Sequence, residues 1–227
     1  MLLRKTQKKN NIRIKKGQFI LIGSLILIIG GVGIIGLRCY QYYNQEKAEQ
    51  KQIDEFIDNQ RTISTVGIIE TENEDINNIQ DIEEKNTDVN NITENYIAVL
   101  EIPKINLKKG LFSIGSDKND VNRNIEIMSE SDMPDVINGN FILAGHSGTS
   151  KISYFRNLNK LEKDDVAYIY YNGGRFLYKL VNSYEIQKTG EASISRNGKK
   201  TTLTLITCKH NTDKQVVYIF ELMKDGE

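Results

Sequence analysis

The longest apolar stretch of the chain lies near its amino terminus. Residues 19–37 (FILIGSLILIIGGVGIIGL) contain no charged side chain, and Ser24 is the only polar one. At the rise of an α-helix this stretch spans roughly 28 Å, about the hydrocarbon thickness of a bilayer. A single helix can cross a bilayer because it satisfies its own backbone hydrogen bonds. The pattern therefore predicts one transmembrane helix over residues 19–37.

After residue 95 the pattern changes to short apolar or alternating runs with turn residues between them. Residues 172–174 (Asn-Gly-Gly) are a strong hairpin turn signal. Helical patterns are confined to residues 121–128 and 153–161. The predicted strands are, in chain order, 96–102, 141–144, 166–171, 175–180, 201–207 and 216–222. Many short strands separated by turn residues predict an antiparallel barrel or sandwich.

The charges are sorted along the chain, although 30 Lys+Arg and 30 Asp+Glu give a formal net charge of zero. Residues 1–38 hold eight basic side chains and no acidic one, which leaves 22 basic against 30 acidic residues, a net charge of −8. This distribution argues against a nucleic-acid-binding protein, because such a protein needs positive charge on the folded face that meets phosphate.

The basic leader also predicts the orientation of the transmembrane helix. Seven Lys/Arg precede the apolar stretch and only Arg38 follows it at once, so the positive-inside rule places residues 1–18 in the cytoplasm. A cleaved signal peptide is an alternative, but the apolar core is long and no small-residue cleavage pattern follows it. Lipid attachment at Cys39 is another, although Arg38 stands where a small residue is expected. We predict a single-pass protein of the cell membrane.

Residues 38–94 form a polar segment between the apolar stretch and the strand-rich part. Residues 40–60 are compatible with a helix, whereas residues 70–94 hold nine acidic residues and one lysine. Such a composition buries too little apolar surface to offset its ordering entropy. We expect an extracellular acidic stalk over 38–94, with an acidic docking segment as the alternative, followed by a folded domain at 95–227.

Cys208 is the first candidate for chemistry, because it ends the apolar run TLTLITC just before the polar run KHNTDK. A thiol at the end of a strand can be exposed and yet rigidly held. Outside the cell idle thiols tend to be oxidised, so a lone cysteine in an exported domain is informative. The alternatives are a small buried core residue and a disulfide with Cys39.

His146 is the candidate partner, because a nucleophilic cysteine usually depends on a histidine. It follows the run FILA in the small-residue turn Gly145-His146-Ser147-Gly148, where glycine lets a substrate backbone approach closely. His210 is the competing histidine, two residues after Cys208. Its lysine-, asparagine- and aspartate-rich surroundings indicate a solvated loop residue.

Four segments together resemble the sortases, the membrane-anchored cysteine transpeptidases of Gram-positive surfaces. YIAVLEIPKINLKKGLF resembles the first strand pair of the family, NGNFILAGHSGT its histidine turn, and SYFRNLNKLEKDD the helix and turn that follow. TLTLITC is close to the TLxTC signature. That signature with an upstream Ala-Gly-His is specific, and the resemblance covers about residues 95–223.

The resemblance implies a mainly β fold, an eight-stranded antiparallel β-barrel with short helices, preceded by one transmembrane helix. It implies that Cys208 is the nucleophile and His146 the general acid/base. The thiolate would cleave an LPxTG-like sorting signal of a surface protein between Thr and Gly. An amine of a cell-wall precursor or of a pilin would then resolve the thioacyl enzyme. We expect Thr207 and Ser147, next to these residues in sequence, to bind substrate.

No cofactor is expected, and no ATP is needed because two consecutive acyl transfers conserve the bond energy. The sequence contains no cysteine- or histidine-based metal constellation, and no spaced acidic loop indicates a calcium site. The partners expected from the resemblance are sorting-signal-bearing surface proteins, the amine acceptor and the membrane, without nucleic acid.

The chain departs from the family at one position. Sortases carry an arginine on the strand after the cysteine, whereas this chain has no arginine after Arg196. By position the arginine falls at Lys214, which keeps a positive donor, or at Gln215, which keeps an uncharged one. Alternatively Arg175 or Arg196 comes from another strand, or the enzyme is slow. A non-catalytic sortase-fold binding module and a thiol peptidase that only hydrolyses are the competing functions.

Overall fold

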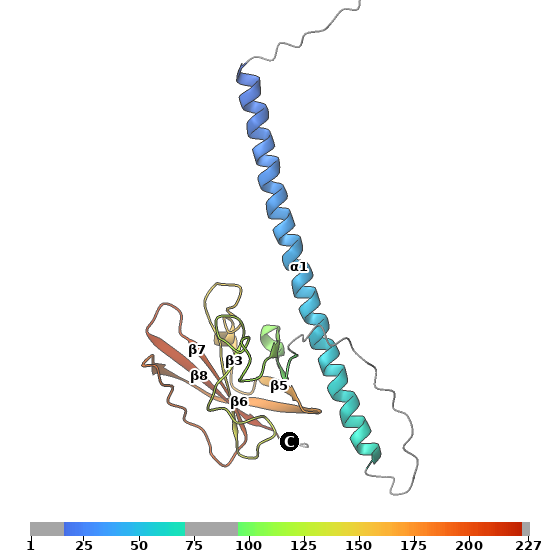
Figure 1. Ribbon diagram of the computed structural model, residues 1–227. Coiled ribbons are helices and arrows are strands. Elements are labelled where there is room, and N and C mark those ends of the chain that lie inside the picture. The colour runs from blue at the N-terminus through green and yellow to red at the C-terminus, as the bar shows by residue number, and fades with distance from the viewer. Residues whose placement is uncertain (1–15, 71–94, 224–227) are drawn as a thin grey trace, which may run out of the picture. The chain divides into compact units, whose positions relative to one another are not determined.

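The computed structural model describes residues 16–70 and 95–223 (Figure 1). The chain divides into two compact units, residues 1–51 and residues 52–227, which are considered separately. A helix of 55 residues, α1 (Lys16–Glu70), begins in the first unit. Among the described residues it is the one helix that is long and apolar enough to cross a membrane, and the apolar part of it described by its side chains is exposed. Length and composition thus agree with the predicted span, while its orientation stays a prediction.

The helix continues past the predicted span into the segment expected to be a stalk. It includes all of residues 40–60, for which the sequence allowed a helix. The expected acidic stalk over 71–94 lies outside the described residues. Within the second unit, Ile53 and Ile57 are buried in a small apolar cluster with Val99 and Tyr170. That compact unit therefore begins before residue 95, and the predicted domain boundary stays a prediction.

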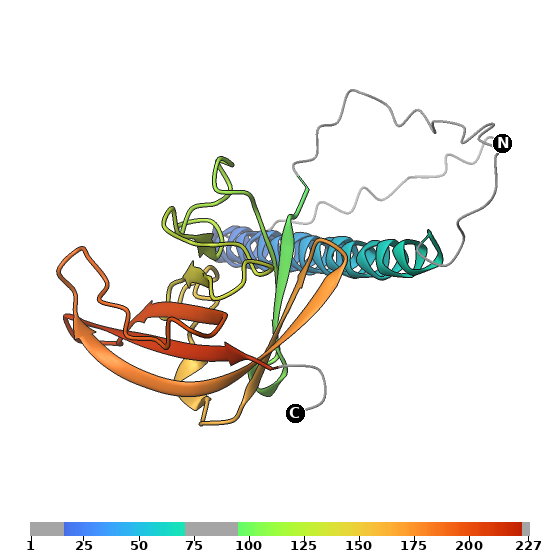
Figure 2. The same cartoon turned by 90° about the horizontal axis from the view of Figure 1, so that it is seen from below.

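The second unit is built on one sheet of eight strands. Figure 2 shows the sheet curving around on itself into a nearly closed barrel. Only two short 3₁₀ helices, η1 (Pro103–Ile105) and η2 (Leu158–Lys160), interrupt residues 95–223. The mainly β barrel predicted from the sequence is confirmed. In the order in which they pair, the strands are β2 (Leu107–Leu111), β1 (Ala98–Ile102), β5 (Val166–Tyr171), β6 (Gly174–Gln187), β8 (Lys214–Leu222), β7 (Thr202–Cys208), β4 (Asn140–Ala144) and β3 (Glu126–Ile127).

The β5–β6 hairpin forms where the sequence predicts it. Its two loop residues, Asn172 and Gly173, have φ angles of 46° and 77°. Positive φ at both positions is what a type I′ turn requires, and such turns match the twist of paired strands. β6 extends to Gln187, further than the predicted 175–180, because its second half pairs with β8 across a register shift between Leu180 and Asn182.

The helix predicted over residues 121–128 is wrong. This segment contains turns followed by the short strand β3. The side chain of Asn119 accepts a hydrogen bond from Ile127 N (2.7 Å) and donates one to Ile127 O (2.9 Å), so it captures the backbone that a helix would use. The second predicted helix, 153–161, is mostly turns and is helical only in η2.

One strand pair differs from the predicted all-antiparallel barrel. β4 and β7 run parallel, with Leu143 opposite Leu205 and Ala144 opposite Ile206, whereas the other pairs in the sheet are antiparallel. Both strands are buried along nearly their whole length. Parallel strands are typically covered on both faces, and in β7 this buries the threonines of TLTLITC as well as its apolar residues. The parallel pairing places the carboxyl ends of β4 and β7 at the same edge of the sheet.

A core substitution tests this packing. Leu205 has no exposed surface and lies between its partners on β4 and β8. Leu205→Ala should lower the free energy of unfolding by about 2–5 kcal/mol, because it removes apolar contacts and leaves a cavity. Urea unfolding of the full-length chain in non-ionic detergent, followed by tyrosine fluorescence, measures the change. Ile137→Ala, at a side chain that is 85% exposed, is the control and should change stability by less than about 0.5 kcal/mol.

Candidate active site

The parallel pair brings the two chemistry-bearing residues to one edge of the barrel. Ala144 and Ile206 are register partners, and each is followed two residues later by His146 and Cys208, respectively. The ladder continues past the end of β4, because Gly145 N donates to Ile206 O (3.1 Å). His146 therefore follows the end of β4 at the level where Cys208 ends the neighbouring strand β7, an arrangement that a thiol and a histidine acting together would need.

Two hydroxyl groups tie the ends of these strands together. Thr207 Oγ1 donates to Gly145 O at 2.7 Å, and Ser147 Oγ donates to Cys208 O. Each hydroxyl thus binds a carbonyl of the opposite segment, and the Thr207 side chain is buried. We call these two bonds the hydroxyl clasp. Both residues line the cavity described below, but their predicted role in binding substrate stays a prediction.

His146 is held by a loop that the sequence did not connect with it. Its Nε2 lies 3.5 Å from Asn122 Oδ1, and the Asn122 amide donates to Asp120 Oδ1 at 3.0 Å. The backbone carbonyl of His146 accepts a hydrogen bond from Phe155 N at 3.0 Å. When Nε2 carries the ring proton, Asn122 fixes the ring and leaves Nδ1 as the basic atom. Asn122 was missed because it lies 24 residues before His146, beyond the reach of any spacing argument.

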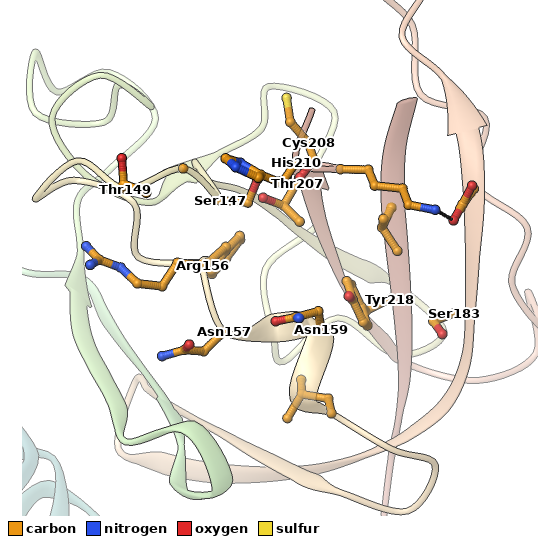
Figure 3. A pocket seen from close by; sticks show the side chains of 16 residues that line it. Ser147, Thr149, Arg156, Asn157, Asn159, Ser183, Thr207, Cys208, His210 and Tyr218 are labelled. Atoms are coloured by element: carbon orange, nitrogen blue, oxygen red, sulfur yellow. Dashed lines mark hydrogen bonds and ion pairs between the residues drawn. The ribbon is translucent and has the colours of Figure 1, made fainter. Parts of the chain in front are cut away.

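A cavity of about 680 Å³ opens beside Cys208, which is half-buried (Figure 3). Because the Cys208 side chain is partly exposed and lines a cavity, it is not simply a buried core residue. His210 is exposed, as predicted, yet it also lines the cavity, whereas His146 is not among the lining residues. The cavity is lined by Ser147, Gly148, Thr149, Phe155, Arg156, Asn157, Asn159, Leu161, Ser183, Glu185, Thr207, Cys208, Lys209, His210, Val216 and Tyr218.

Three charged residues, Glu185, Lys209 and Lys214, form a triad of ion pairs, and the first two of them line the cavity. Glu185 accepts a bond from Lys209 through one oxygen and from Lys214 through the other, the latter at 3.0 Å. These hydrogen bonds lower the pKa of the Glu185 carboxyl below its ordinary value, so it is charged at neutral pH. The triad therefore carries one net positive charge, and the ammonium of Lys214 is directed to Glu185.

Gln215, the alternative to Lys214, is the register partner of Cys208 across the β7–β8 pair. Directly opposite residues of an antiparallel pair share a face of the sheet. Arg175 instead lies over an aromatic ring of β5, with its guanidinium 4.8 Å from the ring centroid. Arg196 donates to carbonyls near the amino ends of β4 and β7. Among the described residues, neither arginine reaches the Cys208 end of the barrel.

The connection from β7 to β8 is short and is hydrogen-bonded both internally and to Lys188, the residue after β6. Lys209 N donates to Lys214 O at 2.8 Å, Thr212 Oγ1 donates to Lys209 O at 3.0 Å, and Lys188 N donates to Asp213 O at 2.9 Å. Cys39 and Cys208, which lie in different units, are both free thiols. Within the described residues there is no group of three or more His, Cys, Asp or Glu side chains suited to a metal ion.

The hydroxyl clasp can be tested at Thr207. Thr207→Val keeps the shape of the side chain but leaves the Gly145 carbonyl without its partner, so we expect a loss of about 1–3 kcal/mol in the free energy of unfolding. Thr207→Ser retains a hydroxyl and should retain more of the stability. Urea unfolding of the full-length variants measures both, and equal stability of Thr207→Val and the parent chain would contradict the clasp.

Comparison with known proteins identifies the family. A family model described as a sortase domain matches residues 100–221. Sortase D of Bacillus subtilis (strain 168) is 33% identical over 110 residues, which is 48% of this chain and about half (52%) of that relative. Sortase A of Bacillus anthracis is 25% identical over 209 residues, covering 89% of this chain and 94% of that protein. The structure of a Clostridium perfringens sortase D5 transpeptidase has the same fold, with a TM-score of 0.54 and 22% sequence identity. The match covers 78% of this chain and 99% of the other. Because the sortase-domain model matches more than half of the length of this chain, the chain belongs to the sortase family.

Proposed function

Sortases as a family are cysteine transpeptidases, and we propose that this chain cleaves an LPxTG-like sorting signal between Thr and Gly and joins the surface protein to an amine. The observation that carries the proposal is the level at which two parallel strands end: His146 follows the end of β4 beside Cys208, the last residue of β7. A partly exposed thiol and an imidazole on neighbouring strand ends are the two groups that thioacyl chemistry needs. The half-buried position of Cys208 in a cavity provides access for substrate.

In the first half-reaction the Cys208 thiolate attacks the Thr carbonyl carbon, and the electron pair of the carbonyl moves onto its oxygen. Collapse of this tetrahedral species breaks the C–N bond. His146 gives its proton to the departing glycine amine, and the Thr acyl group remains on sulfur. Asn122 supports this step by holding the imidazole ring through its Nε2 contact.

The oxyanion needs a donor on the face where Cys208 points. Gln215 is the register partner of Cys208, while Lys214 is bound to Glu185. This arrangement favours Gln215 over Lys214 as the substitute for the family arginine. An amide donor is uncharged, so it stabilises the oxyanion less than a guanidinium does.

The remaining parts of the proposal concern location and partners. A helix of sufficient length and apolar composition near the amino terminus and the basic leader support a single-pass anchor with the barrel outside the cell. There it would meet sorting-signal-bearing surface proteins and an amine acceptor, either a cell-wall precursor or a pilin.

The thiol mechanism is tested with the full-length chain in non-ionic detergent. A panel of LPxTG-like peptides is incubated with and without triglycine, and the products are identified by mass spectrometry. Cys208→Ala should lower cleavage by at least about 10³-fold, because the nucleophile is lost. Cys39→Ala removes the other free thiol and should leave cleavage intact.

Each other outcome contradicts a defined part of the proposal. Cleavage that survives Cys208→Ala would exclude the thiol mechanism. Acid products alone, even at high triglycine, would identify a peptidase. Binding of a peptide without cleavage or adduct would identify a non-catalytic module.

The oxyanion donor is tested by a pair of neighbouring substitutions. Gln215→Ala should lower kcat/KM by about 10²-fold, the loss typical of one oxyanion donor. Lys214→Ala should have a much smaller effect, because its ammonium is bound to Glu185. Steady-state kinetics with the best peptide of the panel measures both. A strong effect at Lys214 with little at Gln215 would reverse the assignment, and no effect at either would discard both.

A further inference from the structure

The backbone of His146 is held on both sides by hydrogen bonds. On the side of the sheet, Gly145 O accepts the hydroxyl of Thr207 at 2.7 Å. On the other side, His146 O accepts the amide of Phe155 at 3.0 Å. Because peptide groups are planar, these two bonds fix the peptide planes before and after the His146 Cα, and with them the direction in which the imidazole leaves the chain. Phe155 lies between β4 and β5, in neither strand, so its own placement depends on other contacts.

The ring of Phe155 lies directly against the turn that carries the histidine. A Cβ atom added to Gly145 would lie 2.8 Å from Phe155 Cδ2 and 3.0 Å from Phe155 Cγ, closer than a side-chain carbon can approach without a shift. Phe155 is 1% exposed and belongs to the main core of the barrel. Glycine at 145 therefore leaves room for this ring. A displacement of Phe155 would reach His146 through both the ring and the amide.

Arg156 closes the turn that leads into Phe155. Its Nε donates to Ser153 O at 2.9 Å, and its Nη2 donates to Ser150 O at 2.6 Å. The hydroxyl groups of Ser150 and Ser153 are hydrogen-bonded to each other at 2.9 Å, and Ser153 is buried. A planar guanidinium can hold two carbonyls at once in a fixed geometry. We call the two bonds from Arg156 the arginine staple.

The guanidinium of Arg156 is not directed to the thiol, although Arg156 lines the cavity beside Cys208. Figure 3 shows its side chain pointing away from Cys208. Two of its three nitrogens donate to the backbone carbonyls of the staple. Any influence of Arg156 on the reaction must therefore pass through the chain.

We propose that Arg156 is a positioning residue for His146, which acts by keeping Phe155 against the histidine turn; this rests on the function proposed above. The route runs from the guanidinium to the carbonyls of Ser150 and Ser153, along the chain to Phe155, and from Phe155 N–H to His146 O. When the staple is lost, the imidazole leaves the position from which it transfers its proton, and small misplacements of a reacting group slow a reaction strongly.

The leaving group decides how much the reaction depends on this position. With a Thr–Gly amide, Cys208 Sγ bonds to the Thr carbonyl carbon, the C–N bond breaks, and His146 gives its proton to the nitrogen that takes the electron pair. In a thioester analogue, with sulfur in place of the glycine N–H, the C–S bond breaks and the electron pair stays on sulfur. A thiolate is a stable anion near neutral pH and leaves without a proton. A misplaced His146 therefore slows cleavage of the amide more than cleavage of the thioester.

The test measures kcat/KM of the full-length chain in non-ionic detergent for the best sorting peptide and for its thioester analogue, with the rate of Cys208→Ala subtracted as background. For both substrates kcat/KM reports the acylation step. Arg156→Gln should lower kcat/KM by about tenfold for the peptide and by less than about twofold for the thioester, because only the peptide needs the general acid. Arg156→Lys keeps the charge without the planar fork and should resemble Arg156→Gln.

Arg196→Gln is the matched control. Arg196 Nη1 also donates to two backbone carbonyls, Asn138 O at 3.1 Å and Lys200 O at 3.2 Å, near the amino ends of β4 and β7. Arg196→Gln should therefore leave kcat/KM unchanged for both substrates.

Hydrogen exchange tests the staple without the reaction. The Phe155 amide is bonded to His146 O, so in Arg156→Gln it should exchange at least about fivefold faster than in the parent chain, as the loss of a local hydrogen-bonded arrangement allows. Mass spectrometry with fragmentation to single residues measures this amide. In Arg196→Gln it should exchange as in the parent chain.

Equal losses for peptide and thioester in Arg156→Gln would indicate contact with substrate or a damaged fold, and would overturn the inference. Full activity of Arg156→Lys would assign the effect to charge and overturn it as well, as would unchanged exchange of the Phe155 amide in Arg156→Gln. Failure of the proposed function gives a different result, because the parent chain would then cleave neither substrate faster than Cys208→Ala while the exchange measurement still reports the staple.

Discussion

The parallel pairing of β4 with β7 is the constraint on which the candidate site depends. In an antiparallel pair the residue after the end of one strand faces the beginning of the other, so His146 and Cys208 would lie at opposite ends of the barrel. The parallel register, with Ala144 opposite Ile206, turns two sequence positions 62 residues apart into neighbours. The hydroxyl clasp then fixes the two strand ends to each other through Thr207 and Ser147.

The same register divides the site into two sides. Alternation along β7 and β8 assigns Cys208 and Gln215 to one face and Thr207 and Val216 to the other. Cys208, the last residue of β7, is therefore bordered by both faces of the sheet.

Much of the barrel was predictable because local signals agreed with the tertiary structure. β5 and the turn at Asn172 and Gly173 follow from alternation and turn chemistry, and the two strand-terminal residues follow from a specific motif pair. The helix at 121–128 was predicted because Val121 and Ile125 are spaced as on one face of a helix. The prediction is wrong because the side chain of Asn119 forms the hydrogen bonds of the Ile127 backbone. Asn122 at His146 and Glu185 between Lys209 and Lys214 depend on loop path and strand register, which no short window of sequence encodes.

The short bonded connection between β7 and β8 has a consequence for motion. Its backbone bonds from Lys209 and Lys188 and the ion pairs to Glu185 leave it little freedom to open and close over the thiol. A preorganised wall loses little conformational entropy when a ligand binds. A substitution in this connection would therefore change the side chains that a ligand meets at fixed backbone positions, without rearranging the loop.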